Sequence, residues 1–109
     1  MSYSSHFLRG HTETIILGIL KDTDSYGYDI LKTILEKGNG LFGIKDATIY
    51  TAFKRMEEEV LITTYWGDEG TGARRKYYSI TKKGRDYYAG KVKEWKEINA
   101  TLNNLIGGN

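Results

Sequence analysis

KDATIYTAFKRMEEEVLI, residues 45–62, has the pattern of one short amphipathic helix followed by a short apolar segment. Its apolar residues recur at three- and four-residue spacing and so predict a single inward face. They are Ile49, Ala52, Phe53, Met56 and Val60. Asp46 is the predicted N-cap, because its carboxylate can accept hydrogen bonds from the first backbone N–H groups of a helix. The stretch therefore predicts a helix that begins at Asp46 and buries one side.

The opposite face of this helix is polar and basic. It consists of Thr48, Tyr50, Thr51, Lys54 and Arg55, with no acid before Glu57. An ordinary solvated helix face mixes both signs of charge, whereas a face of hydroxyls and cations suits a groove lined by phosphates. A plain surface helix remains the alternative for this stretch taken alone.

TTYWGDEGTGARRKYYSIT, residues 63–81, predicts two strands joined by a glycine-containing turn. From Thr71 to Lys83 the chain carries only positive charges, whereas Asp68 and Glu69 lie together on the incoming side. The basic residues are Arg74, Arg75, Lys76, Lys82 and Lys83. A solvated basic tip is the alternative for the hairpin alone, but a hairpin after a helix-turn-helix is the winged-helix arrangement.

Two further helices are predicted before residue 45. Thr12–Lys21 is too apolar for a surface helix and should be buried, with Gly18 allowing another element to approach closely. Ser25 can cap a second helix over Tyr26–Lys37, whose predicted inward residues are Tyr28, Ile30, Leu31, Ile34 and Leu35. Glycines then break the chain, with Leu41 and Phe42 expected beneath the connection. The expected class is mainly α (α+β), a winged helix-turn-helix with a two-stranded wing.

Three blocks of the chain resemble the PadR family of winged-helix transcriptional regulators, in the same order and with similar spacing. They are YGYDI, ATIYTAFKRMEEEVLI and GARRKYYSITKKGRDYY. The similarity is greatest to short PadR-like regulators whose single C-terminal helix carries a tryptophan, here Trp95. It implies a repressor that binds DNA and is released by a flat aromatic or cationic ligand held between subunits. The family usually has glycine where this chain has Val60, so that residue is expected to be strained or the helix end to differ.

The expected DNA contacts combine the helix face with the wing. They are Thr48, Tyr50, Thr51, Lys54, Arg55, Arg74, Arg75 and Lys76. Resemblance to the family's TLYP-type block implies that Tyr50 contacts the DNA backbone; the alternative is a ring packed on the base of its own helix.

The C-terminal part predicts one long helix, capped by Thr81 and reaching about Ile106. Its apolar positions alternate four and three residues apart, with Asn99 filling one polar slot. They are Tyr88, Val92, Trp95, Leu102 and Ile106. The core of the domain is expected to be complete without this helix, so its apolar side predicts the interface of a homodimer. The alternative is that the helix folds back on its own domain. The expected division is a DNA-binding domain with an N-terminal arm at 1–81 and a dimerisation helix at 82–109.

In a two-fold dimer, Trp95 would approach its symmetry mate and form a slot for a planar aromatic guest, which could gain from a positive charge. Asn99 and Phe7 could line the same space. The alternative is a tryptophan that only closes the interface.

The amino-acid composition and the missing motifs exclude several other classes of protein. The 109 residues include no cysteine and only two histidines, so no metal site or cofactor is expected. Nucleophile, P-loop and dinucleotide fingerprints are missing from the sequence, which argues against an enzyme. Without an apolar span or a leader, a cytoplasmic protein is expected. The prediction is a homodimeric repressor on a pseudo-palindromic operator; a winged helix that binds only proteins is the alternative.

Overall fold

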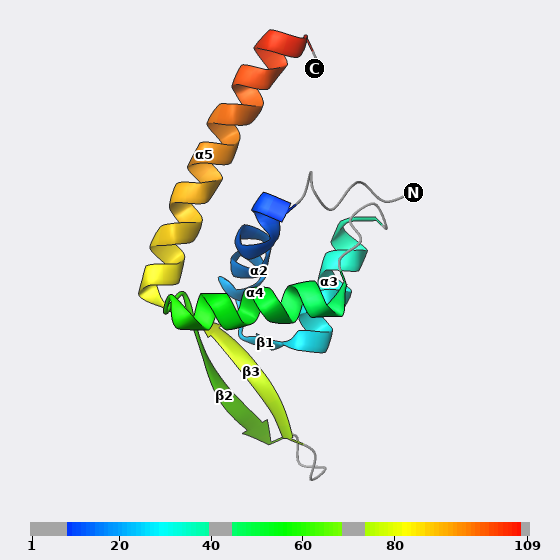
Figure 1. Cartoon of the computed structure of the whole chain (residues 1–109), viewed down its shortest axis with the longest axis vertical. Coiled ribbons are helices and arrows are strands. Elements are labelled where there is room, and N and C mark those ends of the chain that lie inside the picture. The colour runs from blue at the N-terminus through cyan, green and yellow to red at the C-terminus, as the bar shows by residue number, and fades with distance from the viewer. Residues whose placement is uncertain (1–8, 40–44, 69–73, 108–109) are drawn as a thin grey trace.

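The computed structural model describes residues 9–39, 45–68 and 74–107, and it shows helices packed at one end of a small antiparallel sheet (Figure 1). In chain order the elements are a short 3₁₀ turn η1 (Arg9–His11), α2 (Thr12–Leu20), β1 (Ser25–Tyr26), α3 (Gly27–Lys37), α4 (Asp46–Glu58), β2 (Ile62–Asp68), β3 (Arg74–Ile80) and α5 (Lys82–Ile106). The β2–β3 hairpin projects to one side of α4, and α5 runs away on the other. The predicted winged-helix class is confirmed.

One hydrophobic core joins α2, α3 and α4 to the base of the sheet. Its buried members are Ile16, Leu17, Leu20, Ile30, Ile34, Ile49, Ala52, Phe53, Met56, Leu61, Ile62 and Tyr78. The ring of Phe53 stacks on the ring of Tyr78, with centroids 4.2 Å apart, so α4 is fastened to the middle of β3. Four of the five predicted inward residues of α4 are therefore in the core, as their spacing required.

The sheet has three strands in the order β1, β3, β2. The hairpin is paired from Ile62 opposite Ile80 to Asp68 opposite Arg74, as the turn pattern predicted. The two-residue strand β1 was not predicted: Ser25 pairs with Tyr78 instead of capping the next helix. The Ser25 hydroxyl donates to Asp29 at 3.1 Å. A strand this short has no alternation that could reveal it in the sequence.

Two predicted core residues of α3 lie at the surface. Tyr28 is 70% exposed and Leu35 is 46% exposed, whereas Ile30 and Ile34 are buried. Helical residues turn by about 100° each, so Tyr28 lies about 200° from Ile30 and cannot share its face. The stripe through Ile30 and Ile34 is buried, and Leu31 is partly buried against the core.

The two ends of α4 also differ from the prediction. Asp46 is the first helical residue and Lys45 is the cap, with no side-chain hydrogen bond at that position. The Asp46 carboxylate still lies in the first turn, where the helix dipole favours a negative charge. At the other end, Val60 is 54% exposed and does not belong to the inward face.

Val60 occupies a left-handed backbone position, with φ of 59°. The Leu61 N–H donates to the Met56 carbonyl at 2.9 Å, and the Val60 N–H donates to the Glu57 carbonyl at 3.0 Å. This pair of hydrogen bonds is the Schellman helix ending, whose left-handed residue is usually glycine. The strain expected at Val60 is thus present, because a β-branched side chain is disfavoured at positive φ.

Replacing Val60 with glycine should stabilise the protein by about 1 kcal/mol, because the left-handed backbone is less costly without a Cβ atom. The corresponding rise in Tm is roughly 4–8 °C for a small domain. Thermal unfolding followed by circular dichroism measures it, with Val60→Ala as the control that keeps a Cβ atom at the same φ. An unchanged or lower Tm for Val60→Gly would contradict the strain.

The first turns of α5 are part of the core. The Thr81 hydroxyl accepts from the Gly84 N–H at 2.9 Å, which confirms the predicted cap, and it also donates to the Val60 carbonyl at 2.7 Å. A Cβ atom on Gly84 would lie 2.1 Å from the Leu61 carbonyl oxygen. One on Gly18 would lie 3.2 Å from the Tyr88 ring, which is the close approach expected at Gly18. The prediction that α5 has no core to join is therefore wrong for its first two turns.

The expectations for Phe7, Leu41 and Phe42 concern positions outside the described residues. Within the described ranges, no helix combines the length and the apolar character needed to cross a membrane.

Candidate nucleic-acid interface

All five predicted contact residues of α4 are exposed. Thr51 and Lys54 lie opposite the buried stripe of the helix, so they point away from the protein. The Thr51 hydroxyl donates to the Ala47 carbonyl at 2.8 Å, and its oxygen can still accept from a partner. Thr48 lies on the flank nearest α2, where a hollow of about 310 Å³ separates it from Thr12.

Arg55 is engaged by an acid that the sequence pattern did not connect with it. Its Nε donates to the Glu13 carboxylate of α2, and the two side chains form an ion pair. Glu13 is only 15% exposed, whereas Arg55 is 55% exposed. A guanidinium has five N–H donors, so Arg55 is anchored by Glu13 and retains donors for a second acceptor.

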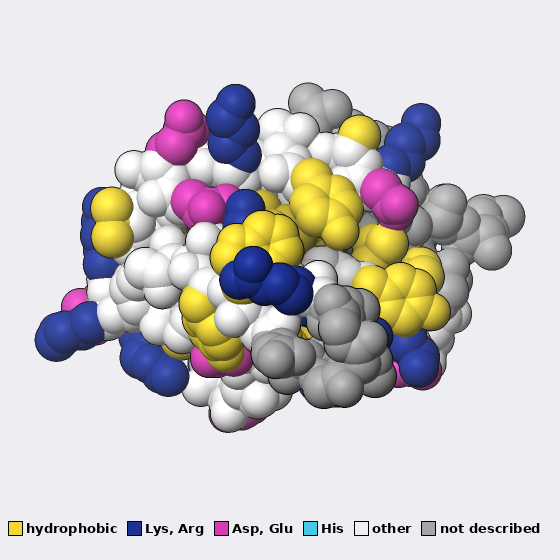
Figure 2. Space-filling view, turned by 90° about the horizontal axis from the view of Figure 1, so that it is seen from below, with side chains coloured by type: hydrophobic (Ala, Val, Ile, Leu, Met, Phe, Trp, Pro, Cys, Tyr) yellow, Lys and Arg dark blue, Asp and Glu magenta, His cyan; other side chains and the backbone are white. Residues whose placement is uncertain are grey.

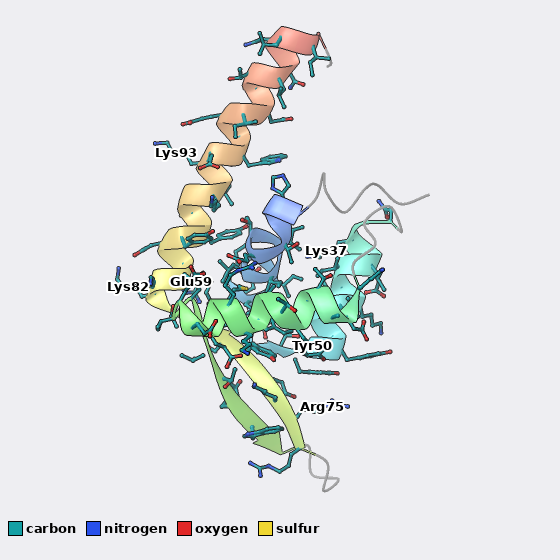
Figure 3. The ribbon with its side chains drawn as sticks, in the orientation of Figure 1. Lys37, Tyr50, Glu59, Arg75, Lys82 and Lys93 are labelled. Carbon is teal, nitrogen blue, oxygen red and sulfur yellow. The ribbon has the colours of Figure 1, made fainter. Side chains whose placement is uncertain are left out.

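Tyr50 packs on its own helix, which was the alternative to a contact with the DNA backbone, and it is also exposed. Its ring meets the Phe53 ring edge to face, with centroids 5.5 Å apart, and half of the side chain remains exposed. Figure 3 shows it on the side of α4 toward the wing, where Arg75 is also labelled. The ring thus packs on its own helix while the hydroxyl lies next to Gly27 at the start of α3.

The basic side chains of β3 lie over aromatic rings. The Arg74 guanidinium is 5.4 Å from the centre of the Trp66 ring, and that of Arg75 is 4.5 Å from the Tyr26 ring. The Lys76 ammonium is 5.7 Å from the Tyr78 ring. Figure 2 shows aromatic and basic side chains interleaved on the face seen from below. Such cation–π contacts hold exposed cations in place without neutralising them.

Arg74 and Lys76 share a sheet face with Tyr78, because residues two apart on a strand point the same way. That face is turned toward α4, since Tyr78 stacks on Phe53. Lys76 is also 3.9 Å from the Glu57 carboxylate of α4. Two of the three predicted wing cations therefore lie on the side of the sheet that carries α4.

The other face of the hairpin carries a row of tyrosines. Tyr65 and Tyr77 are stacked at 5.5 Å, and Tyr26 meets Tyr77 edge to face at 5.6 Å. The Tyr65 hydroxyl donates to Asp24 at 2.6 Å, and this hydrogen bond raises the pKa of Tyr65. A Cβ atom on Gly67 would lie 2.3 Å from the Tyr77 ring, which explains a glycine inside a strand. The sequence indicated Tyr65 and Tyr77 only as strand formers, and Tyr26 was predicted to begin a helix.

A groove of about 380 Å³ lies between α2 and α5, away from the basic surface. It is lined by Gly10, His11, Thr14, Ile15, Gly18, Tyr88, Lys91, Val92, Glu94, Trp95 and Ile98. Trp95, one of the predicted ligand contacts, is half exposed in it. Asn99, another, is exposed on α5 but is not among the lining residues.

Continuous with the groove, α5 carries an exposed apolar stripe. It consists of Trp95, Ile98, Leu102, Leu105 and Ile106, each between 45% and 76% exposed. The sequence pattern predicted three of them and missed Ile98 and Leu105. Two other predicted seam residues, Tyr88 and Val92, lie partly buried beside α2 of the same chain. A long apolar stripe in water is typical of a surface that meets a partner.

Residues 16–90 match the model of a known family, the transcriptional regulator PadR-like family. A transcriptional regulator from Clostridium thermocellum is 43% identical and superposes with a TM-score of 0.85, covering 94% of this chain and 96% of that one. A PadR family transcription regulator from hypervirulent Clostridium difficile is 36% identical with a TM-score of 0.81, covering 88% and 98%.

The negative transcriptional regulator PadR of Bacillus subtilis is 31% identical over 70 residues, which are 64% of this chain and 38% of that protein. The structure of Bacillus subtilis PadR in complex with operator DNA is 28% identical with a TM-score of 0.67, covering 73% and 45%. The chain thus spans less than half of that regulator's length.

Proposed function

We propose, because this chain belongs to the PadR-like family of transcriptional regulators, that it binds double-stranded DNA as a homodimer and represses transcription. Family membership makes it a regulator of transcription and not an enzyme. The DNA, the dimer and the repression are the proposal, and the similarity to the regulator solved with operator DNA supports the first of them.

The observation that carries DNA binding is the shared orientation of two basic surfaces. The outward face of α4 presents Thr51 and Lys54, and Arg74 and Lys76 lie on the sheet face turned toward α4. In a winged helix this arrangement places the helix in the major groove and the wing against the neighbouring backbone. Thr51 and Lys54 would then contact base edges, and the wing cations would contact phosphates.

The test is a selection of binding sites from a random duplex library, followed by salt titration of the winning sequence. We expect a pseudo-palindrome whose half-sites are about one helical turn apart, and an affinity that falls steeply with salt. A protein that ignores duplex DNA at low salt but captures a protein partner in high salt would favour the winged helix as a protein-binding module.

The exposed stripe of α5 supports the homodimer. A pair of such helices can cover each other's apolar residues, and the nearby α2–α5 groove adds surface to the contact. Two-fold symmetry would place two copies of α4 on the same side of the dimer, as a palindromic operator requires.

Leu102→Glu should convert the dimer to monomers at tens of micromolar, because it places a charge in the middle of the stripe. Light scattering after size exclusion measures the mass. Asn104→Glu is the control, since residue 104 lies about 160–200° from Leu102 around α5 and the added charge is the same. Monomeric wild-type protein, or equal effects of the two variants, would remove the stripe from the interface.

The α2–α5 groove supports a ligand site at Trp95 that controls release from DNA. Trp95 and Ile98 provide apolar surface for a planar guest, and the indole face of Trp95 would favour a positive charge on it; Glu94 in the same groove is paired with Lys91 at 3.8 Å. A second copy of the chain would bring a second Trp95 toward this space, as a slot for a planar cation requires.

A planar cationic dye should quench Trp95 fluorescence in a saturable way and weaken DNA binding. The measurement uses Trp66→Phe, so that Trp95 is the only indole. Adding Trp95→Ala should abolish tight dye binding because one wall of the slot is lost. Undiminished dye affinity in that variant would show that Trp95 only closes the interface.

A further inference from the structure

Gly27, the first residue of α3, lies directly beneath the hydroxyl of Tyr50. A Cβ atom at residue 27 would be 2.3 Å from the Tyr50 Oη and 2.9 Å from its Cζ. Real Cβ atoms do not come so close, so any larger residue would force the ring to move. The missing side chain of Gly27 is therefore what allows the observed position of Tyr50.

The Tyr50 hydroxyl borders a polar corner of about 320 Å³ between α3, α4 and β3. Its walls are Tyr26, Gly27, Tyr28, Tyr50, Arg75, Lys76 and Tyr78. Within the described residues the structure shows no hydrogen bond for the Tyr50 hydroxyl. The corner thus combines phenol donors with basic side chains at the junction of helix and wing.

The charges around the corner suit an anion. Lys76 is 42% exposed, and its ammonium stays 3.9 Å from Glu57, too far for a hydrogen bond. A tyrosine hydroxyl is protonated at neutral pH, and burial raises the pKa of Tyr78 further, to about 12. Phenol and ammonium groups both donate hydrogen bonds, and phosphate oxygens only accept them.

We propose that this corner binds one phosphate of the DNA backbone, and that Gly27 is the positioning residue that holds the Tyr50 hydroxyl toward it. The inference rests on the proposed DNA binding and assigns a role to a residue outside the helix face and the wing cations. The corner lies between α4 and the wing. With α4 in the major groove and the wing on the neighbouring backbone, the corner would face a phosphate at the edge of the major groove.

The experiment compares Gly27→Ala, Tyr50→Ala and the double variant on a fluorescent mixed-sequence duplex of about 30 base pairs, because backbone contacts act on any sequence. Each single variant should lose roughly tenfold in affinity, the usual effect of removing a hydrogen bond to a charged group. The double variant should lose no more than Tyr50→Ala, since Gly27 acts only through that ring. Tyr50→Phe should give the same loss with the ring kept in place.

Salt dependence distinguishes the loss of a neutral phenol contact from the loss of a charged contact. Tyrosine is neutral, so the Gly27 and Tyr50 variants should keep the wild-type slope of log affinity against log salt, whereas Lys76→Ala should reduce it by about 0.9. Wild-type affinity in Gly27→Ala, or additive losses in the double variant, would overturn the inference. Wild-type protein that binds no duplex at low salt would instead overturn the proposed function.

Discussion

Gly84→Ala is expected to destabilise the protein by about 3 kcal/mol, because the added methyl group would meet backbone that has no room to shift. The added Cβ atom would lie 2.1 Å from the Leu61 carbonyl oxygen and 2.9 Å from Ile80 Cγ1. The Leu61 carbonyl cannot move aside easily, because it accepts from the Thr81 N–H at 3.1 Å. Helix α5 would have to lift away from the end of α4, and the Thr81 cap would be lost with it.

Gly90→Ala is the matched control for this substitution. Gly90 is in the same helix, and a Cβ atom there would meet no heavy atom within 4 Å among the described residues. The change should stabilise by about 0.5–1 kcal/mol, the usual gain of alanine over glycine in a helix. Urea unfolding followed by circular dichroism compares the two variants. Equal stabilities would show that α5 does not approach Leu61 as closely as the structure has it.

Arg74→Ala combined with Arg75→Ala should lower DNA affinity on every sequence and reduce the salt slope by up to about 1.8, or 0.9 for each phosphate that is no longer neutralised. At about 0.1 M salt the affinity should fall on the order of a hundredfold, as expected for two charged hydrogen bonds. The guanidinium groups are held over the Trp66 and Tyr26 rings, so they are already placed for binding. Fluorescence anisotropy across a salt series measures both quantities.

Lys93→Ala with Lys96→Ala removes the same charge from α5, where both lysines are exposed. Figure 3 shows Lys93 on the side of α5 that points away from α2. This control should leave the salt slope unchanged, whereas Thr51 or Lys54 substitutions should change the preference between operator variants. A wing variant with the wild-type slope would show that the wing does not contact phosphates.

Local patterns predicted the exposed face of α4 and the position of the hairpin. The 3.6-residue period of Ile49, Ala52, Phe53 and Met56 is enough to determine which side of α4 is exposed. The glycines between the two strands indicated the turn of the hairpin, and the stretch from Thr71 to Lys83 without an acid indicated its basic side chains. The hydroxyl of Thr81 is the kind of side chain that caps a helix, here α5. Each of these signals lies within a few residues of the feature it predicts.

The features that were missed depend on residues far apart in the chain. Glu13 and Arg55 are 42 positions apart, and nothing local in either segment indicates their ion pair. Ser25 has the chemistry of a helix cap, yet pairing with Tyr78 determines its backbone. The packing of Gly84 on Leu61 likewise exists only once α4 and the wing have folded. Tertiary contact decides such cases over local preference.

The row of tyrosines behind the wing affects the entropy of DNA binding. A two-stranded hairpin alone is marginally stable in water and would lose much conformational freedom when it docks. Here Tyr65, Tyr77 and Tyr26 pack in sequence, and the hydrogen bond from Tyr65 to Asp24 ties the hairpin to the turn before β1. Strands β2 and β3 have therefore lost part of that freedom during folding, so ordering them costs less of the free energy gained from contacts with phosphates.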